Sequence, residues 1–158
     1  MLQKPDPLGT GLACMAVLAI GACGGSSPAG PAGPAGLQVG GAYQITPTLL
    51  QDACGGATVT PGPAQVAHTL GASQFQLTHV GNTYSGRVDT TGSFTIDPLN
   101  LSLGSGATAS VRIEGRFSTG GFEATVTVDE TRAGTTAPCR YLVRWQATKQ
   151  GPPNVLPS

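Results

Sequence analysis

The chain has 158 residues, room for one ordinary domain with short appendages, and its eight basic and eight acidic residues balance to a formal net charge of zero. Charged residues make up only 10% of the chain. This composition argues against an acidic disordered chain, and against a protein that binds DNA, RNA or an anionic membrane surface through charge.

An apolar run covers residues 8–22. Its last three residues and the cysteine after it read Ile20-Gly21-Ala22-Cys23, and the chain then becomes polar. The run is shorter than the roughly 20 residues that a membrane-spanning helix needs. Its ending resembles the lipobox of bacterial lipoproteins, in which a branched apolar residue and two small residues precede the cysteine that receives the lipid. The resemblance implies that residues 1–22 are a cleaved signal peptide and that Cys23 becomes the lipidated first residue, carrying fatty acids such as palmitate.

The same resemblance implies a location in the bacterial cell envelope, with the membrane as a partner through Cys23. Gly24 follows the cysteine, and the aspartate that favours inner-membrane retention in some Gram-negative bacteria is missing. An outer-membrane location is therefore expected in such an organism, with the domain in the periplasm or at the cell surface.

Residues 23–36 comprise the lipidated cysteine and a linker of Gly, Ser and three tandem Pro-Ala-Gly triplets. Small residues and prolines have no apolar side chain to bury, so this composition predicts a solvated spacer. Stretched as polyproline, the linker would reach roughly 40 Å and hold a folded domain away from the membrane.

From Leu37 onward apolar and polar residues alternate, which is the period of half-buried strands, and no window shows the spacing of an amphipathic helix. Asp97-Pro98 interrupts the alternation, after which Leu99, Leu101 and Leu103 alternate with polar neighbours. Gly81-Asn82 has the composition of a two-residue hairpin turn. The expected strands are residues 41–46, 65–70, 74–80, 83–89, 93–96, 107–118, 122–129 and 139–146. An all-β domain is predicted for residues 37–150, with a disordered tail at 151–158.

About seven to nine strands joined by tight turns form an antiparallel meander, which must curl or fold over to cover its apolar face. Cys54 follows the first expected strand and Cys139 begins the last, and export favours a disulfide between them over two free thiols. Pairing of the first and last strands would bring these cysteines together in a small closed barrel, similar in size to lipocalin-like and avidin-like barrels. A two-sheet β-sandwich with the same disulfide is the alternative.

Residues that could carry chemistry are few. The sequence contains no Gly-x-Ser-x-Gly elbow and no Gly-rich phosphate loop, and no cofactor is expected. Glu114, Glu123 and Asp129 alternate outward beside arginine or threonine, so we interpret them as a solvated face with cross-strand ion pairs such as Arg112 or Arg116 with Glu123.

His68 and His79 both fall on the predicted inner face of the sheet. In a hairpin around residues 71–73 the two imidazoles are expected to lie near each other, where Asp89 or Glu123 would complete a metal site. The plainer interpretation is two hydrogen-bonded histidines at a barrel rim, with no metal.

The sequence therefore favours a non-enzymatic, lipid-anchored envelope protein whose β-domain binds a ligand or partner that the sequence does not specify. A structural surface lipoprotein without a pocket is the second hypothesis, and a metal-dependent enzyme using His68 and His79 is the third. An apolar cavity lined by Tyr43, Tyr84, Val126 and Trp145 would separate the first hypothesis from the second, because a pure core packs solid.

Overall fold

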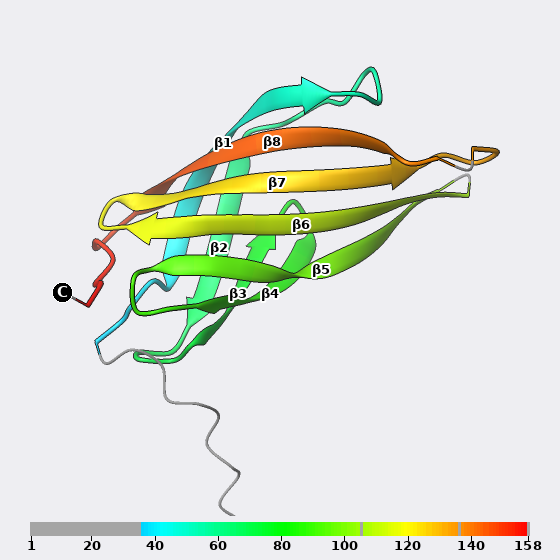
Figure 1. Cartoon of the computed structure of the whole chain (residues 1–158). Helices are drawn as coiled ribbons and strands as arrows, with labels where there is room; N and C mark the ends of the chain where they lie inside the picture. Colours follow the sequence, from blue (N-terminus) through cyan, green and yellow to red (C-terminus); the bar gives the residue numbers. More distant parts are fainter. Residues whose placement is uncertain (1–35, 105, 136, 158) are drawn as a thin grey trace, which may run out of the picture.

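The computed structural model describes residues 36–104, 106–135 and 137–157. The predicted signal peptide, Cys23 and nearly all of the linker lie outside these residues. Eight strands follow one another in sequence order, each antiparallel to the next, and β1 pairs with β8 to close a barrel (Figure 1). The strands are β1 Gly41–Asp52, β2 Gly62–His68, β3 Gln74–His79, β4 Asn82–Val88, β5 Ser93–Gly104, β6 Ala107–Ser118, β7 Gly121–Thr131 and β8 Cys139–Gln150. The predicted all-β meander and its closure as a barrel are confirmed.

The seam between the first and last strands is held by a disulfide. The β1–β8 register runs from Ala42 opposite Gln150 to Asp52 opposite Tyr141. Just beyond that end, Cys54 and Cys139 are bonded, with their Cα atoms 5.0 Å apart. The predicted pairing of these cysteines is confirmed.

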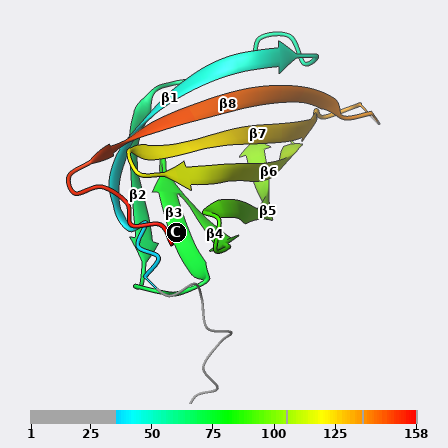
Figure 2. The same cartoon turned by 60° about the vertical axis from the view of Figure 1, so that its left-hand side comes forward.

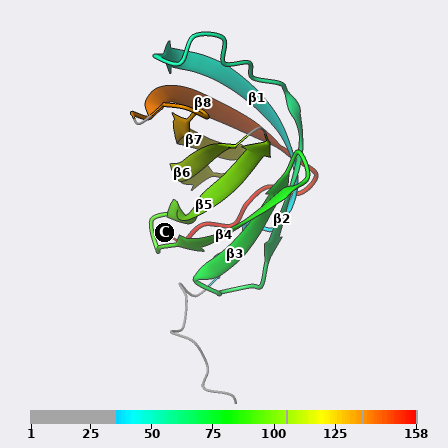
Figure 3. The ribbon, with the colours of Figure 1, turned by 90° about the vertical axis from the view of Figure 1, so that its right-hand side faces the viewer.

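The strands differ in length, and this gives the barrel two unlike ends. Strands β2, β3 and β4 have 7, 6 and 7 residues, whereas β1, β5, β6 and β8 have 12 and β7 has 11. The long strands therefore extend past the short ones as a curved sheet (Figures 1 and 3). We call this extension the overhang: residues 46–52 of β1, residues 97–104 of β5, and the parts of β6, β7 and β8 between them.

Aromatic side chains fill the barrel at the end away from the overhang. Five of them pack together with ring centroids 4.8 to 6.4 Å apart, namely Tyr43, Phe75, Phe94, Phe117 and Phe122. Glycines make room for these rings, because a Cβ on Gly86 would lie 2.7 Å from the Phe75 ring and one on Gly115 would lie 2.6 Å from the Phe94 ring. This end of the barrel is a packed core.

The tail predicted to be disordered is ordered over residues 151–157, so the prediction was wrong there and the folded body extends past Gln150. Gln38 and Val155 exchange two backbone hydrogen bonds of 2.9 and 3.0 Å. Asn154 is 4% exposed, and its amide donates to the carbonyls of Ser118 and Gly121. The segment crosses the end of the barrel beside the first described residues (Figure 2). Backbone hydrogen bonds to Gln38 and the hydrogen bonds of the buried Asn154 side chain hold this segment, and an alternation pattern reveals neither.

One turn and one strand also differ from the prediction. The β3–β4 turn consists of Val80 and Gly81, with φ of 47° and 76°, and the register places His79 opposite Asn82. The predicted turn at Gly81-Asn82 was therefore displaced by one residue, because a valine with positive φ is not expected. Asp97-Pro98 lies inside β5, where the register with β6 shifts between Ile96 and Leu99.

Candidate functional site

The two histidines lie at opposite ends of the β2–β3 hairpin. The register places His68 opposite Phe75, next to the turn, and His79 opposite Ala64. The expectation that the imidazoles would be neighbours was wrong, because in an antiparallel hairpin a residue beside the turn cannot pair with one at the far end of the partner strand.

Each imidazole contacts the protein instead. Nε2 of His68 is 2.9 Å from the Ala72 carbonyl oxygen, and Nδ1 of His79 is 3.0 Å from the Pro63 carbonyl oxygen. The His79 ring also packs edge-on against Trp145, with centroids 5.1 Å apart. These contacts are those of two structural histidines.

The residues considered as a third ligand are engaged elsewhere. The Asp89 carboxylate accepts hydrogen bonds from Thr91 and Ser93 in the β4–β5 turn, and Glu123 is exposed on the outer face near Gln146. Arg112, expected to pair with Glu123, forms its ion pair with Asp129 at 2.9 Å. That carboxylate also binds Arg140 at 2.7 Å.

Among the described residues, one group has the spacing of metal ligands: Cys54, Glu130 and Cys139. The two sulfurs are bonded to each other and offer no thiolate, which is the form that binds metal. The described part of the chain therefore provides no built metal site at this cluster.

The side chains considered as a pocket lining belong to the core. Tyr43, Tyr84, Val126 and Trp145 are each at most 7% exposed. Trp145 packs against His79 and Tyr84, and Tyr43 packs against Phe117 and Phe122. The side-chain contacts at these positions are those of a packed interior.

A groove of about 720 Å³ crosses the outer surface of β2, β3 and β4. Its polar lining includes Gln38, His68, Thr69, Gln74, Gln76, Ser85, Arg87 and Asp97. These groups can form hydrogen bonds, and they include one carboxylate, Asp97, and one guanidinium, Arg87.

The overhang exposes large apolar side chains. Leu50 of β1 and Leu103 of β5 are each 51% exposed. Four more apolar side chains of the overhang are half-buried and pack against the core, namely Leu49, Leu99, Leu101 and Tyr141. The overhang is therefore an apolar surface continuous with the core.

The edge of the overhang formed by β5 has no partner strand among the described residues. β4 pairs with β5 only from Phe94 to Ile96, whereas β6 pairs with β5 as far as Gly104. Pro98 stands at the start of the unpaired part, a position that suits proline because an edge strand tolerates the missing N–H. Residues 98–104 carry no charged side chain, although charges are a usual protection of exposed edges.

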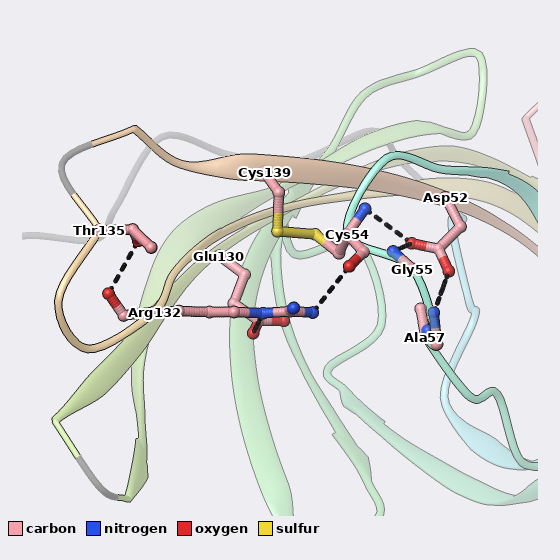
Figure 4. A network of polar contacts seen from close by, with 9 residues as sticks. Asp52, Cys54, Gly55, Ala57, Glu130, Arg132, Thr135 and Cys139 are labelled. Atoms are coloured by element: carbon pink, nitrogen blue, oxygen red, sulfur yellow. Dashed lines mark hydrogen bonds and ion pairs between the residues drawn. A yellow bond between two sulfur atoms is a disulfide. The ribbon is translucent and has the colours of Figure 1, made fainter.

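The edge formed by β1 is different, because the loop at 53–61 is fixed where the strand ends (Figure 4). β2 pairs with β1 only up to Ile45, so residues 46–52 also lack a second strand. The Asp52 carboxylate accepts backbone N–H bonds of 2.8 to 2.9 Å from Cys54, Gly55, Gly56 and Ala57. These bonds, that of Ala57 foremost, hold the pKa of Asp52 below its ordinary value.

Two further contacts fasten the same loop. Arg132 donates to the Cys54 carbonyl oxygen at 2.9 Å, and the disulfide ties Cys54 to β8 (Figure 4). Val59, farther along the loop, packs against the core. The loop after β1 is therefore built into the barrel, whereas β5 has no such attachment among the described residues.

The overhang lies at the end of the barrel opposite the first described residues. β6 begins in the overhang at Ala107 and ends at Ser118, whose carbonyl binds Asn154 beside the Gln38–Val155 bridge. Comparisons of this chain with known protein families, curated proteins and solved structures find no match. No helix in the described residues has the length and hydropathy to cross a membrane.

Sequence reasoning identified the apolar alternation of Leu99, Leu101 and Leu103 but did not identify it as an edge. The available signal was proline inside two strand-like stretches, at Pro47 and Pro98. Each proline marks where one neighbouring strand ends, because a strand paired on both sides rarely accommodates a residue without an N–H.

Proposed function

We propose that this protein is a lipid-anchored, non-enzymatic protein of the bacterial cell envelope, and that the overhang is its binding surface. The observation that carries the binding role is the exposure of Leu103 on the unpaired edge of β5, together with the exposure of Leu50 on β1, at the other edge of the overhang. Exposed apolar patches on an otherwise polar surface commonly mark interaction sites. The anchor rests on the resemblance of Ile20-Gly21-Ala22-Cys23 to a lipobox.

The two parts of the proposal are compatible in space. The described chain begins at the end of the barrel away from the overhang, which we call the closed end. Leu37 and Val39 are fully buried there. A tether entering there leaves the overhang at the other end available to a partner. The linker, if extended, would add roughly 40 Å between the lipid and this end.

A structural surface lipoprotein without a ligand pocket is the second candidate. The packing of five aromatic rings inside the barrel favours it over a carrier of a small molecule, because the rings occupy the space a ligand would take. The exposed leucines of the overhang favour the binding role over this candidate.

The anchor is tested by expressing the full chain in a bacterium that is fed radiolabelled palmitate. Cys23→Ser is expected to abolish the label and to leave the precursor uncleaved. Cys14→Ser, which changes a cysteine inside the apolar run, is the matched control. This variant is expected to be labelled and cleaved like the wild type. Equal processing and labelling of wild type and Cys23→Ser would contradict the anchor.

The binding surface is tested in the same cells with a photo-crosslinking amino acid at one position at a time. At position 103, on the overhang, we expect a discrete crosslinked product. At position 125, exposed on the outer face of β7, we expect none. Absence of a product at 103, or equal products at both positions, would contradict a binding role of the overhang.

A further inference from the structure

We propose that the unpaired edge of β5, residues 97–104, pairs with the same edge of a second copy of this chain, forming a two-fold symmetric dimer with one continuous antiparallel sheet. The inference rests on the proposed binding role of the overhang and names its partner. It follows from the side-chain pattern of residues 97–104, from their lack of like charges that would meet, and from the symmetry of the contact.

The side-chain pattern of the edge is self-complementary. In an antiparallel pair, residues directly opposite each other project from the same face of the sheet. If Leu101 lies opposite Leu101 of the second copy, Leu99 lies opposite Leu103, and Asn100 lies opposite Ser102. All leucines then share the inner face, and the two overhangs join into one apolar surface. A shift by one residue would place leucine opposite a polar residue.

Charge does not oppose this pairing. Residues 98–104 contain no charged side chain, and Asp97, the one charged residue of the edge, would lie at opposite ends of the paired segment in the two copies. Two copies therefore bring no like charges together along the strand, and nothing at the edge resembles the lysines that protect many exposed edges. A charged peptide would gain no ion pair from residues 98–104, so the observations favour an apolar strand as the partner.

The symmetry of the contact favours a dimer over a filament. A two-fold contact uses the same edge in both copies, so it closes at two copies. Residues 46–52 of β1 also lack a second strand, but that edge ends at a loop fastened by the Asp52 hydrogen bonds, Arg132 and the Cys54–Cys139 disulfide. Pairing through β5 uses the edge that carries Leu99, Leu101 and Leu103.

The register is tested by disulfide crosslinking of the full-length protein in its own membranes. Leu101→Cys places a thiol where the two-fold axis would cross the strand. We expect a disulfide-linked dimer on a non-reducing gel, at least tenfold more abundant than for Thr125→Cys, which lies on the outer face of β7 away from the edge. Equal yields from the two variants would overturn the proposal.

A second pair of variants tests the edge without adding a thiol. Ser102→Lys puts a charge on the exposed outer face of the edge strand, and Thr108→Lys puts the same charge directly opposite it on β6, away from the edge. In the Leu101→Cys background, Ser102→Lys is expected to reduce the dimer at least fivefold, and Thr108→Lys to leave it unchanged. Dimer that survives Ser102→Lys would overturn the proposal.

The products also separate this proposal from the proposed function. Crosslinks from position 101 to a different protein, with no dimer, would overturn pairing of two copies while supporting the binding role of the overhang. No product of any kind from positions 101 and 103 would overturn both. The lipid anchor is tested independently by Cys23→Ser.

Discussion

The two ends of the barrel are built in opposite ways. At the closed end, Leu37 and Val39 are buried, and the buried side chain of Asn154 forms several hydrogen bonds to the barrel. At the overhang, apolar side chains remain exposed and the backbone of β5 lacks a second neighbour. The closed end has the construction of a structural element, whereas the overhang leaves surface uncovered, and we attribute that difference to binding.

At the closed end, a few polar side chains hold residues 151–157 against the barrel. The Asn154 side-chain oxygen accepts hydrogen bonds of 2.7 Å from both the Tyr43 hydroxyl and the Lys149 ammonium. The Lys149 ammonium also donates to the Gly40 carbonyl and lies 5.0 Å from the centre of the Tyr43 ring. Burial raises the pKa of Tyr43 well above its ordinary value and lowers the pKa of Lys149. These contacts hold residues 151–157 against the barrel.

The largest effect is expected from the disulfide at the overhang. It closes a loop spanning 85 residues, and removing it by Cys54→Ser with Cys139→Ser should lower the free energy of unfolding by roughly 4 kcal/mol through chain entropy. Urea unfolding of the variant and the wild type measures this difference. Equal midpoints in the two proteins would mean that the seam is held without the bond.

The next largest effect is expected at the closed end. Asn154→Ala removes the side-chain hydrogen bonds to Tyr43, Lys149, Ser118 and Gly121 and should cost about 2 to 3 kcal/mol. Asn100→Ala, on the exposed edge of β5, is the matched control and should change stability by less than about 0.5 kcal/mol. If both substitutions cost the same, the proposed difference between the two ends is wrong.

A smaller gain is expected from the turn between β3 and β4. Val80 has a φ of 47° and is 69% exposed, so its conformation is strained and its side chain is little buried. Val80→Asn supplies the Asn-Gly pair that this turn favours and should raise the free energy of unfolding by about 1 kcal/mol. A loss of stability in urea unfolding would show that the valine side chain makes a necessary contact.

The smallest effect is expected from acidification of the loop after β1. A carboxyl whose pKa is lower in the folded state contributes stability above its unfolded pKa, and this contribution disappears as the pH falls through the folded pKa. Backbone hydrogen bonds lower the pKa of Asp52. The wild type should therefore be more stable than Asp52→Ala, and this difference in stability should be larger at pH 7 than at pH 3. Melting temperatures at the two pH values test this, and a difference that grows at pH 3 would contradict it.

Much of the fold could be predicted because alternation and cysteine position are local signals with a direct physical meaning. Phe122, Ala124, Val126 and Val128 alternate with polar residues, and all four face the core. Cys54 and Cys139 flank the strands that meet at the seam. At each of these positions the residue type and its spacing along the chain indicate whether the side chain is buried or bonded.

The features that could not be predicted depend on register. His68 and His79 share a face, but only the pairing of β2 with β3 reveals that they lie at opposite ends of the hairpin. Asn154 gives no sign in the sequence that Ser118 and Gly121 will be its partners. The edge of β5 appears only once β4 is known to end its pairing at Ile96.

The most direct test of the account is amide hydrogen exchange of the full-length protein, reconstituted in vesicles at low and high surface density. We predict that residues 98–104 exchange faster than the β6 residues beside them at low density, and that protection of this segment alone increases at high density. Residues 46–52 should not change. If residues 98–104 exchange as fast at high density as at low density, no second copy covers the edge and the central claim is contradicted.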